Sequence, residues 1–356
     1  MRFLVPILPV TPVLVGVVLV GVVLVGGCLL EPVGAPTGDP SVDGVEELTP
    51  SEGFQIHVAP FEVPSGVEVQ DCYFVAVPDI NHGEDIFIDR FKLGQRTGSH
   101  HLNVFRVNTI FNLSGAPGDV VHGGECRISP NWSDWPLVVN DQQSSNGEFD
   151  WTLPDGVAQR FHPGELLMVQ THYVKANLQK TPTGGEARIN FYLSKAASPI
   201  EMGTLFATQQ SIRVCQSQPA VSYSGTCNFP VGKDVHIAAA NGHAHSRLTS
   251  LEMYTWDGLS LDQPADDAMF YKSEHWDEPP MSVGLDAKAP GGGGVWWTCN
   301  YQWHEPATGC DVVNERDHQQ AGDCCYTFGN SAEVAEHCNV FVYYWPKVDS
   351  SSIFCD

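Results

Sequence analysis

The sequence predicts an all-β protein whose body consists of two tandem antiparallel β-sandwich domains. Short runs in which apolar and β-branched residues alternate with polar ones recur from about residue 54 to the C-terminus, and this period of two is typical of strands. Gly, Pro and Asn separate the runs, and helical periodicity is scarce. A boundary near Ser198-Pro199 divides the body into halves of similar size. We therefore assign residues 53–198 to an N-terminal domain and residues 199–356 to a C-terminal domain.

The first element of the chain predicts export. Residues 3–30 are almost wholly apolar and uncharged, with only Arg2 in front, and the run ends in Leu24-Val25-Gly26-Gly27-Cys28, which is similar to the lipobox of a bacterial lipoprotein. We predict a signal peptide over residues 1–28 and a lipid anchor at Cys28. A plain signal anchor is the alternative, because the run is long enough to span a bilayer. Both interpretations give an exported protein, either a cell-envelope lipoprotein or an extracellular one.

The second element is a predicted linker. Residues 29–52 contain Pro, Gly and six acids but no Lys or Arg. This composition favours a disordered, solvated tether between the membrane anchor and the folded body.

Cysteine count and charge set limits on function. Ten of the eleven cysteines remain after Cys28 is assigned to the anchor, and this even number suits disulfide bonds in an oxidising compartment. The formal net charge of −24 argues against nucleic acid or anionic lipid as a partner bound through a basic face.

Histidines in four separate strand-like runs are the candidate functional residues. They predict two three-histidine metal sites assembled by the fold, a pattern that suits redox copper better than structural zinc. The six residues are His100, His101, His172, His243, His245 and His337.

Strand parity predicts where some of these side chains point. His243 and His245 are two positions apart and should share one face of a strand. His337 and Asn339 should likewise look into a cleft, while Cys338 enters the core. By the same count His236 should face away from His243, as a structural histidine.

The adjacent pair His100-His101 needs a different explanation, because neighbours on a regular strand diverge. Both can bind one ion at a strand end, at a bulge, or through different ring nitrogens, and Gly98 just before them makes an irregularity plausible.

In their order and spacing, the segments GSHHLNVF, VQTHYV, GHAHSRL and EHCNVFVYYW resemble the copper type II, ascorbate-dependent monooxygenases. The resemblance spans about residues 54–356. It implies two jelly-roll-like β-sandwich domains, each with one copper ion, across a wet interdomain cleft. One ion would be held by His100, His101 and His172 and would store an electron from ascorbate. The other, at His243, His245 and residue 337, would be the site of O2 and substrate.

The resemblance also implies disulfide pairs. Cys299 would pair with Cys338, and Cys227 with Cys355. Cys72–Cys126 and a bridge from Cys310 to either Cys324 or Cys325 are further suggestions, which leave Cys215 and the other member of the Cys324-Cys325 pair without an assigned partner.

Three positions depart from the family pattern. His337 stands where the family has a methionine, and this third imidazole favours Cu(II) or even Zn(II) over Cu(I). Asn241 stands where the peptide-amidating members place a substrate-binding arginine, and Phe341 replaces their substrate-facing tyrosine, whereas Asn339 is retained. Asn339, Phe341 and Asn241 are therefore candidate substrate contacts, for a substrate less polar than a peptide carboxylate.

The sequence thus favours a copper-dependent monooxygenase that hydroxylates a C–H bond of a small molecule with O2 and a one-electron donor such as ascorbate. A copper-binding protein of metal homeostasis, on the same scaffold but without catalysis, is the main alternative. A zinc hydrolase with a single three-histidine site is a third interpretation, which leaves the other three histidines unexplained.

Overall fold

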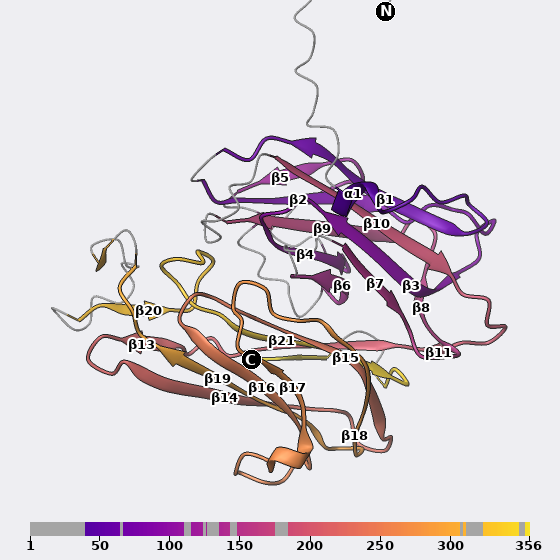
Figure 1. The fold of residues 1–356 in the computed structure, drawn as a ribbon. Coiled ribbons are helices and arrows are strands. Elements are labelled where there is room, and N and C mark those ends of the chain that lie inside the picture. Colours follow the sequence, from indigo (N-terminus) through magenta and orange to yellow (C-terminus); the bar gives the residue numbers. More distant parts are fainter. Residues whose placement is uncertain are drawn as a thin grey trace, which may run out of the picture. The chain divides into compact units, whose positions relative to one another are not determined.

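A computed structural model shows a protein whose regular secondary structure is almost entirely β-strand, which confirms the all-β prediction (Figure 1). It describes residues 40–64, 67–109, 115–123, 126, 135–142, 148–174, 184–306, 309–310, 323–348 and 353–356. The helical elements with described bounds are α1 (Pro40–Asp43) and the 3₁₀ turn η1 (Asp266–Ala268). Within the described residues no helix is long and apolar enough to cross a membrane. The predicted signal peptide and Cys28 lie outside the described residues.

Two sheets are formed almost wholly by strands before residue 198. The first has the order β1-β10-β3-β8-β11, with β7 also paired to β3; its strands are β1 (Gly53–Phe61), β3 (Ile86–Gln95), β7 (Glu148–Thr152), β8 (Val157–Phe161), β10 (Gly185–Leu193) and β11 (Ile200–Glu201). The second has the order β5-β2-β9-β4-β6, from β2 (Val69–Ala76), β4 (Ser99–Arg106), β5 (Val120–His122), β6 (Leu137–Asp141) and β9 (Leu166–Tyr173). All their pairings are antiparallel except β8 with β11.

Strands after residue 202 form the remaining sheets. A five-stranded sheet has the order β18-β15-β21-β12-β22, from β12 (Gly203–Thr208), β15 (Val235–Ala244), β18 (Ser282–Ala289), β21 (Cys338–Trp345) and β22 (Ile353–Cys355). A four-stranded sheet has the order β14-β19-β16-β17, from β14 (Ala220–Asn228), β16 (Leu248–Trp256), β17 (Met269–Ser273) and β19 (Gly294–Gln302). A small ribbon pairs β13 (Arg213–Cys215) with β20 (Cys325–Thr327).

Strand β21 contributes to two hydrophobic cores. Val340 and Val342 belong to the core of the later strands, whereas Phe341 and Tyr343 belong to a core built mainly from residues before 198. Alternate side chains of one strand point to opposite faces, so β21 is buried on both sides. The two halves of residues 38–356 accordingly form one compact unit.

A β-bulge overturns the predicted direction of His236. The register of β15 shifts between Ile237 and Ala239, and His236 pairs with Trp345 across the sheet while His243 pairs with Asn339. Residues directly opposite each other share a face, and Trp345 and Asn339 are an even number of positions apart on β21, so His236 lies on the same face as His243. Its ring stacks on Trp345, 4.1 Å between centroids, and it does not join the other histidines.

The predicted disordered linker is wrong for residues 40–52. Val42 and Val45 are buried, and α1 contacts β3 and β10. The main-chain oxygen of Glu46 accepts hydrogen bonds from the side-chain amides of Gln55 and Asn190. The two buried valines thus hold this segment against the folded body, although its composition is mostly acidic and polar. Residues 29–39 lie outside the described residues.

Disulfide bonds join strands that are distant in sequence. Both pairings that the resemblance implied are confirmed, as is Cys72–Cys126, and Cys310 pairs with Cys324. The fifth bond, Cys215–Cys325, was not predicted; it forms because β13 and β20 place these two residues opposite each other. Five disulfides in one chain are typical of an exported protein.

Candidate metal centre

All six predicted histidines lie in one buried cluster. The His100 ring is 5.2 Å from His172 and 5.0 Å from His243, centroid to centroid, and the His245 and His337 rings are 4.4 Å apart. Each of the six is at most 6% exposed. The structure therefore brings both predicted trios together, with the rings of His100 and His101 only 5.0 and 5.1 Å from that of His243.

A β-bulge explains how the neighbouring residues His100 and His101 can both face the cluster. The pairing of β4 with β9 shifts register between Ser99 and His101, which makes His100 the extra residue, and Gly98 has a φ of 98°. His101 stays in register opposite His172. The irregularity that Gly98 predicted is present, and both rings face the cluster because of it.

Hydrogen bonds occupy the ring nitrogens of His101 and His172. His172 Nδ1 lies 3.1 Å from His101 Nε2, and its Nε2 lies 2.8 Å from a carboxylate oxygen of Glu68. A carboxylate accepts, so His172 donates from Nε2 and keeps the lone pair of Nδ1 for the cluster. The side-chain amide of Asn103 lies 3.2 Å from His101 Nδ1.

The histidines of the later strands are oriented in a similar way. The side-chain oxygen of Gln142 lies 2.9 Å from His243 Nδ1, and the main-chain oxygen of Ala335 lies 3.1 Å from His245 Nδ1. Because both partners only accept, His243 and His245 donate from Nδ1, and their Nε2 lone pairs face the cluster. His243 Nε2 lies 3.0 Å from His337 Nδ1.

Burial keeps these rings neutral. Burial, reinforced by the neighbouring histidines, lowers the pKa of His100, His101, His243 and His337 well below the usual value, and the pKa of His245 falls to about 3. The neutral imidazole is the form that binds a metal ion.

Nε2 of His100 and Nε2 of His245 are buried and make no hydrogen bond within the described residues. A buried polar atom without a partner is costly, and in native proteins it often marks the place of an ion or a water molecule. Imidazole nitrogens suit copper and zinc, so the residues present fit a metal of this class.

A small pocket of about 40 Å³ adjoins the cluster. Asn339 and Phe341, two of the three predicted substrate contacts, line it together with five of the histidines. Its lining includes no acidic side chain, lysine or arginine. This volume is of the order of one or two water molecules, and it leaves little room for a substrate in this arrangement.

Asn241 does not occupy the position predicted for it. It is fully buried, its side-chain oxygen accepts from the amides of Asn140 and Gln142, and its side-chain amide donates to the carbonyls of Pro279 and Pro280. A residue with every polar atom engaged inside the protein cannot hold a substrate. Asn241 instead links the two halves of the chain.

Sequence reasoning missed the residues that orient the ligands. Gln142 and Glu68 lie in segments that carry no motif. A signal was present for Glu336 and Arg247, which flank the histidine motifs directly. The Glu336 carboxylate accepts from the backbone N–H groups of His245 and Arg247, at 3.3 and 3.0 Å, and burial raises its pKa to about 8.

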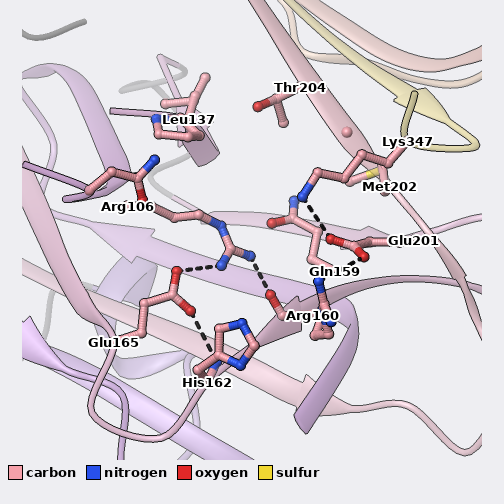
Figure 2. A pocket seen from close by; sticks show the side chains of 13 residues that line it. Arg106, Leu137, Gln159, Arg160, His162, Glu165, Glu201, Met202, Thr204 and Lys347 are labelled. Carbon is pink, nitrogen blue, oxygen red and sulfur yellow. Dashed lines mark hydrogen bonds and ion pairs between the residues drawn. The ribbon is translucent and has the colours of Figure 1, made fainter. Parts of the chain in front are cut away.

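A second pocket, of about 150 Å³, contains none of the predicted site residues (Figure 2). Its cations are paired with its acids: Arg106 contacts Glu165 at 2.5 Å, and Lys347 contacts Glu201 at 2.7 Å. Arg160 also lies 3.4 Å from Glu201. Because these charges are already neutralised, the pocket offers no evident anion site.

Comparisons with known proteins add no identification. No family model and no curated protein matches the sequence. Solved structures with some likeness include a protein of Parabacteroides distasonis provisionally described as secreted (9% identity, TM-score 0.20, covering 85% of this chain and 92% of that one). Two others are from infectious bursal disease virus. The structure of the Gx strain has 7% identity and a TM-score of 0.19, and the match covers 85% of this chain and 76% of that one. The VP2 subviral particle has 8% identity and a TM-score of 0.16, and the match covers 87% of this chain and 79% of that one. Likenesses at these TM-scores support no conclusion about this chain.

Proposed function

We propose that this protein is an exported, copper-dependent monooxygenase that hydroxylates a C–H bond of a small uncharged molecule. The observation that carries the proposal is the single buried cluster of six histidines, contributed by both halves of the chain. Copper held there would supply the one-electron steps that O2 and a donor such as ascorbate require. The lipobox-like segment further suggests attachment to the cell envelope through Cys28.

The protein's own residues would fix the ligands and exclude water. Glu68, Gln142 and the Ala335 carbonyl hold three of the imidazoles with one lone pair toward the cluster. Such outer partners raise the basicity of a ligand and fix its ring orientation. The burial of all six rings keeps bulk water away from bound metal.

The lining of the adjoining pocket favours an uncharged substrate. Asn339 and Phe341 offer an amide and an aromatic face, and the pocket presents no charged partner for a carboxylate. The pocket must widen before a substrate can enter, so the proposal requires the contacts around the cluster to loosen during turnover.

A copper-binding protein without catalysis is the second candidate. The small volume of the pocket and the all-imidazole ligand set, with His337 in place of a thioether, favour tight holding of Cu(II).

The test is ascorbate-driven O2 uptake by the copper-loaded, desalted protein. A panel of small uncharged aromatic and amide compounds would be added, and transfer of labelled oxygen from ¹⁸O2 into product would be measured. Uptake coupled to labelled product supports the monooxygenase. Copper that stays bound while no compound is labelled supports the binding protein. His243→Ala is the control, because it removes a ligand from the proposed O2 site.

A further inference from the structure

We propose that His100, His243 and His245 form a shared metal site that joins the two halves of the chain and takes the first transition-metal ion to bind. The inference rests on the proposed function, since it concerns the same histidine centre. It differs from the two separate trios in drawing its ligands from both halves.

The spacing of ligand atoms favours this set. One ring nitrogen from each of the three residues can be chosen so that all lie within 4.8 Å of one another, and all three side chains are buried. His100 comes from β4 and His243 from β15, with His245 directly after that strand. Metal–nitrogen bonds of about 2.0–2.1 Å require the three atoms to close by roughly 1 Å, a shift within the reach of side-chain rotation.

The pattern of hydrogen bonds favours the same set. Nε2 of His100 and Nε2 of His245, which both belong to it, are buried and make no hydrogen bond within the described residues. His101 and His172, in contrast, use both of their ring nitrogens, with each other and with Asn103 and Glu68. An ion that binds at Nε2 of His100 and of His245 breaks no hydrogen bond within the described residues. An ion that binds at both His101 and His172 must break the hydrogen bond between these two rings.

The third ligand is already oriented from the other half. Gln142 fixes Nδ1 of His243, so its Nε2 is the available lone pair, and an ion there would displace only the contact to His337 Nδ1. His337 is therefore not needed for the first ion. This separates the shared site from the C-terminal trio, in which residue 337 is a ligand.

The experiment measures retention of substoichiometric Cu²⁺ after desalting, by elemental analysis, in four single variants. The shared site predicts that His100→Gln and His245→Gln bind this first ion more than about 100-fold more weakly, because losing a ligand costs more than losing one of its supporting partners. His172→Gln and His337→Gln should retain it. If two separate trios exist, each variant leaves one trio intact and all four retain the ion; that result would overturn the shared site and leave the proposed function standing.

A measurement on the unaltered chain covers the case in which a variant fails to fold. With one equivalent of Zn²⁺ as a diamagnetic probe, long-range ¹H–¹⁵N spectra should show the Nε2 resonances of His100, His243 and His245 moving to metal-bound positions, while His172 stays unchanged. Movement of His172 together with His100 and His101 would contradict the shared site. Failure of the unaltered chain to retain either metal would overturn both proposals.

Discussion

At the scale of single residues, Gln142 connects the histidine cluster to the contact between the halves. It is fully buried; its side-chain oxygen accepts from His243, and its side-chain amide donates to the carbonyl of Gly242 and to Asn241. One amide from the N-terminal half thus fixes both the tautomer of a predicted ligand and the backbone beside it.

Replacing Gln142 with methionine should weaken metal binding about 10–100-fold, because His243 loses the partner that orients it. The unpaired groups left behind should also lower the free energy of unfolding by about 1–3 kcal/mol. Competition with a chromogenic chelator measures the affinity, and urea denaturation measures the stability.

The matched control is Gln159→Met. Gln159 is also buried but donates only to the carbonyl of Val138, away from the histidines. It should lose stability without losing metal affinity. Equal affinity in both variants and the unaltered chain would show that Gln142 has no orienting role.

Residue identity and parity predicted six histidines that the structure brings together, but not every side-chain direction. Gly98 signalled the bulge at His100, whereas nothing in the sequence signals the bulge that turns His236. The resemblance predicts Asn241 as a substrate contact, whereas its partners Asn140 and Pro280 are far away in sequence. Such long-range contacts depend on how sheets dock, which a local pattern does not encode.

At the scale of elements, the bulge in β4 should depend on the backbone of Gly98. Its φ of 98° is a conformation that favours glycine, so Gly98→Ala should lower the free energy of unfolding by about 1–3 kcal/mol. Because the strain falls beside His100, metal affinity should fall as well. Thermal melts and chelator competition on the same samples measure the two effects.

Gly118→Ala provides a control with nearly the same φ. Gly118 has a φ of 96° in a turn where an added Cβ would meet nothing within 4 Å. It should show a comparable loss of stability at unchanged metal affinity. If Gly98→Ala also leaves the affinity unchanged, the bulge does not position His100.

The disulfide between β19 and β21 should hold the strand next to His337. Cys299–Cys338 closes a segment of 39 residues, so Cys299→Ala combined with Cys338→Ala should lower the free energy of unfolding by about 2–5 kcal/mol. Hydrogen exchange of the β21 amides should become faster. Unchanged exchange and an unchanged denaturation midpoint would argue against this stabilising role. The control is Cys72→Ala combined with Cys126→Ala, which removes a disulfide in another sheet and should leave the exchange of the β21 amides unchanged.

At the scale of the whole molecule, strand patterns predicted the sheets but not the merging of the two metal trios. Parity correctly placed His243 and Asn339 on one face of their sheet. It could not show that this face packs on the other half, where Tyr343 donates to Asn140 and the His243 ring lies 5.1 Å from His101. How the two halves pack depends on the shapes of two folded surfaces, which strand parity does not predict.

This packing makes acid sensitivity a property of the whole molecule. The five histidines with lowered pKa values stay neutral in the folded chain, whereas in the unfolded chain they bind protons below about pH 6.5. The unfolded state then holds more protons, so stability is lost as the pH falls below that value. Glu336 acts in the opposite direction: its folded pKa of about 8 exceeds the usual value, and its contribution fades as the pH rises from about 4.5 to 8.

The five histidines should outweigh the single carboxyl group. For the metal-free chain we expect the free energy of unfolding to fall between about pH 6.5 and 5, with a slope of up to about 1.4 kcal/mol per pH unit for each titrating histidine. Urea denaturation across this range, with a chelator present, measures the slope. His100→Gln should flatten it, because one buried group no longer titrates. A stability that stays constant down to pH 5 would mean that the cluster opens and admits water before it is protonated.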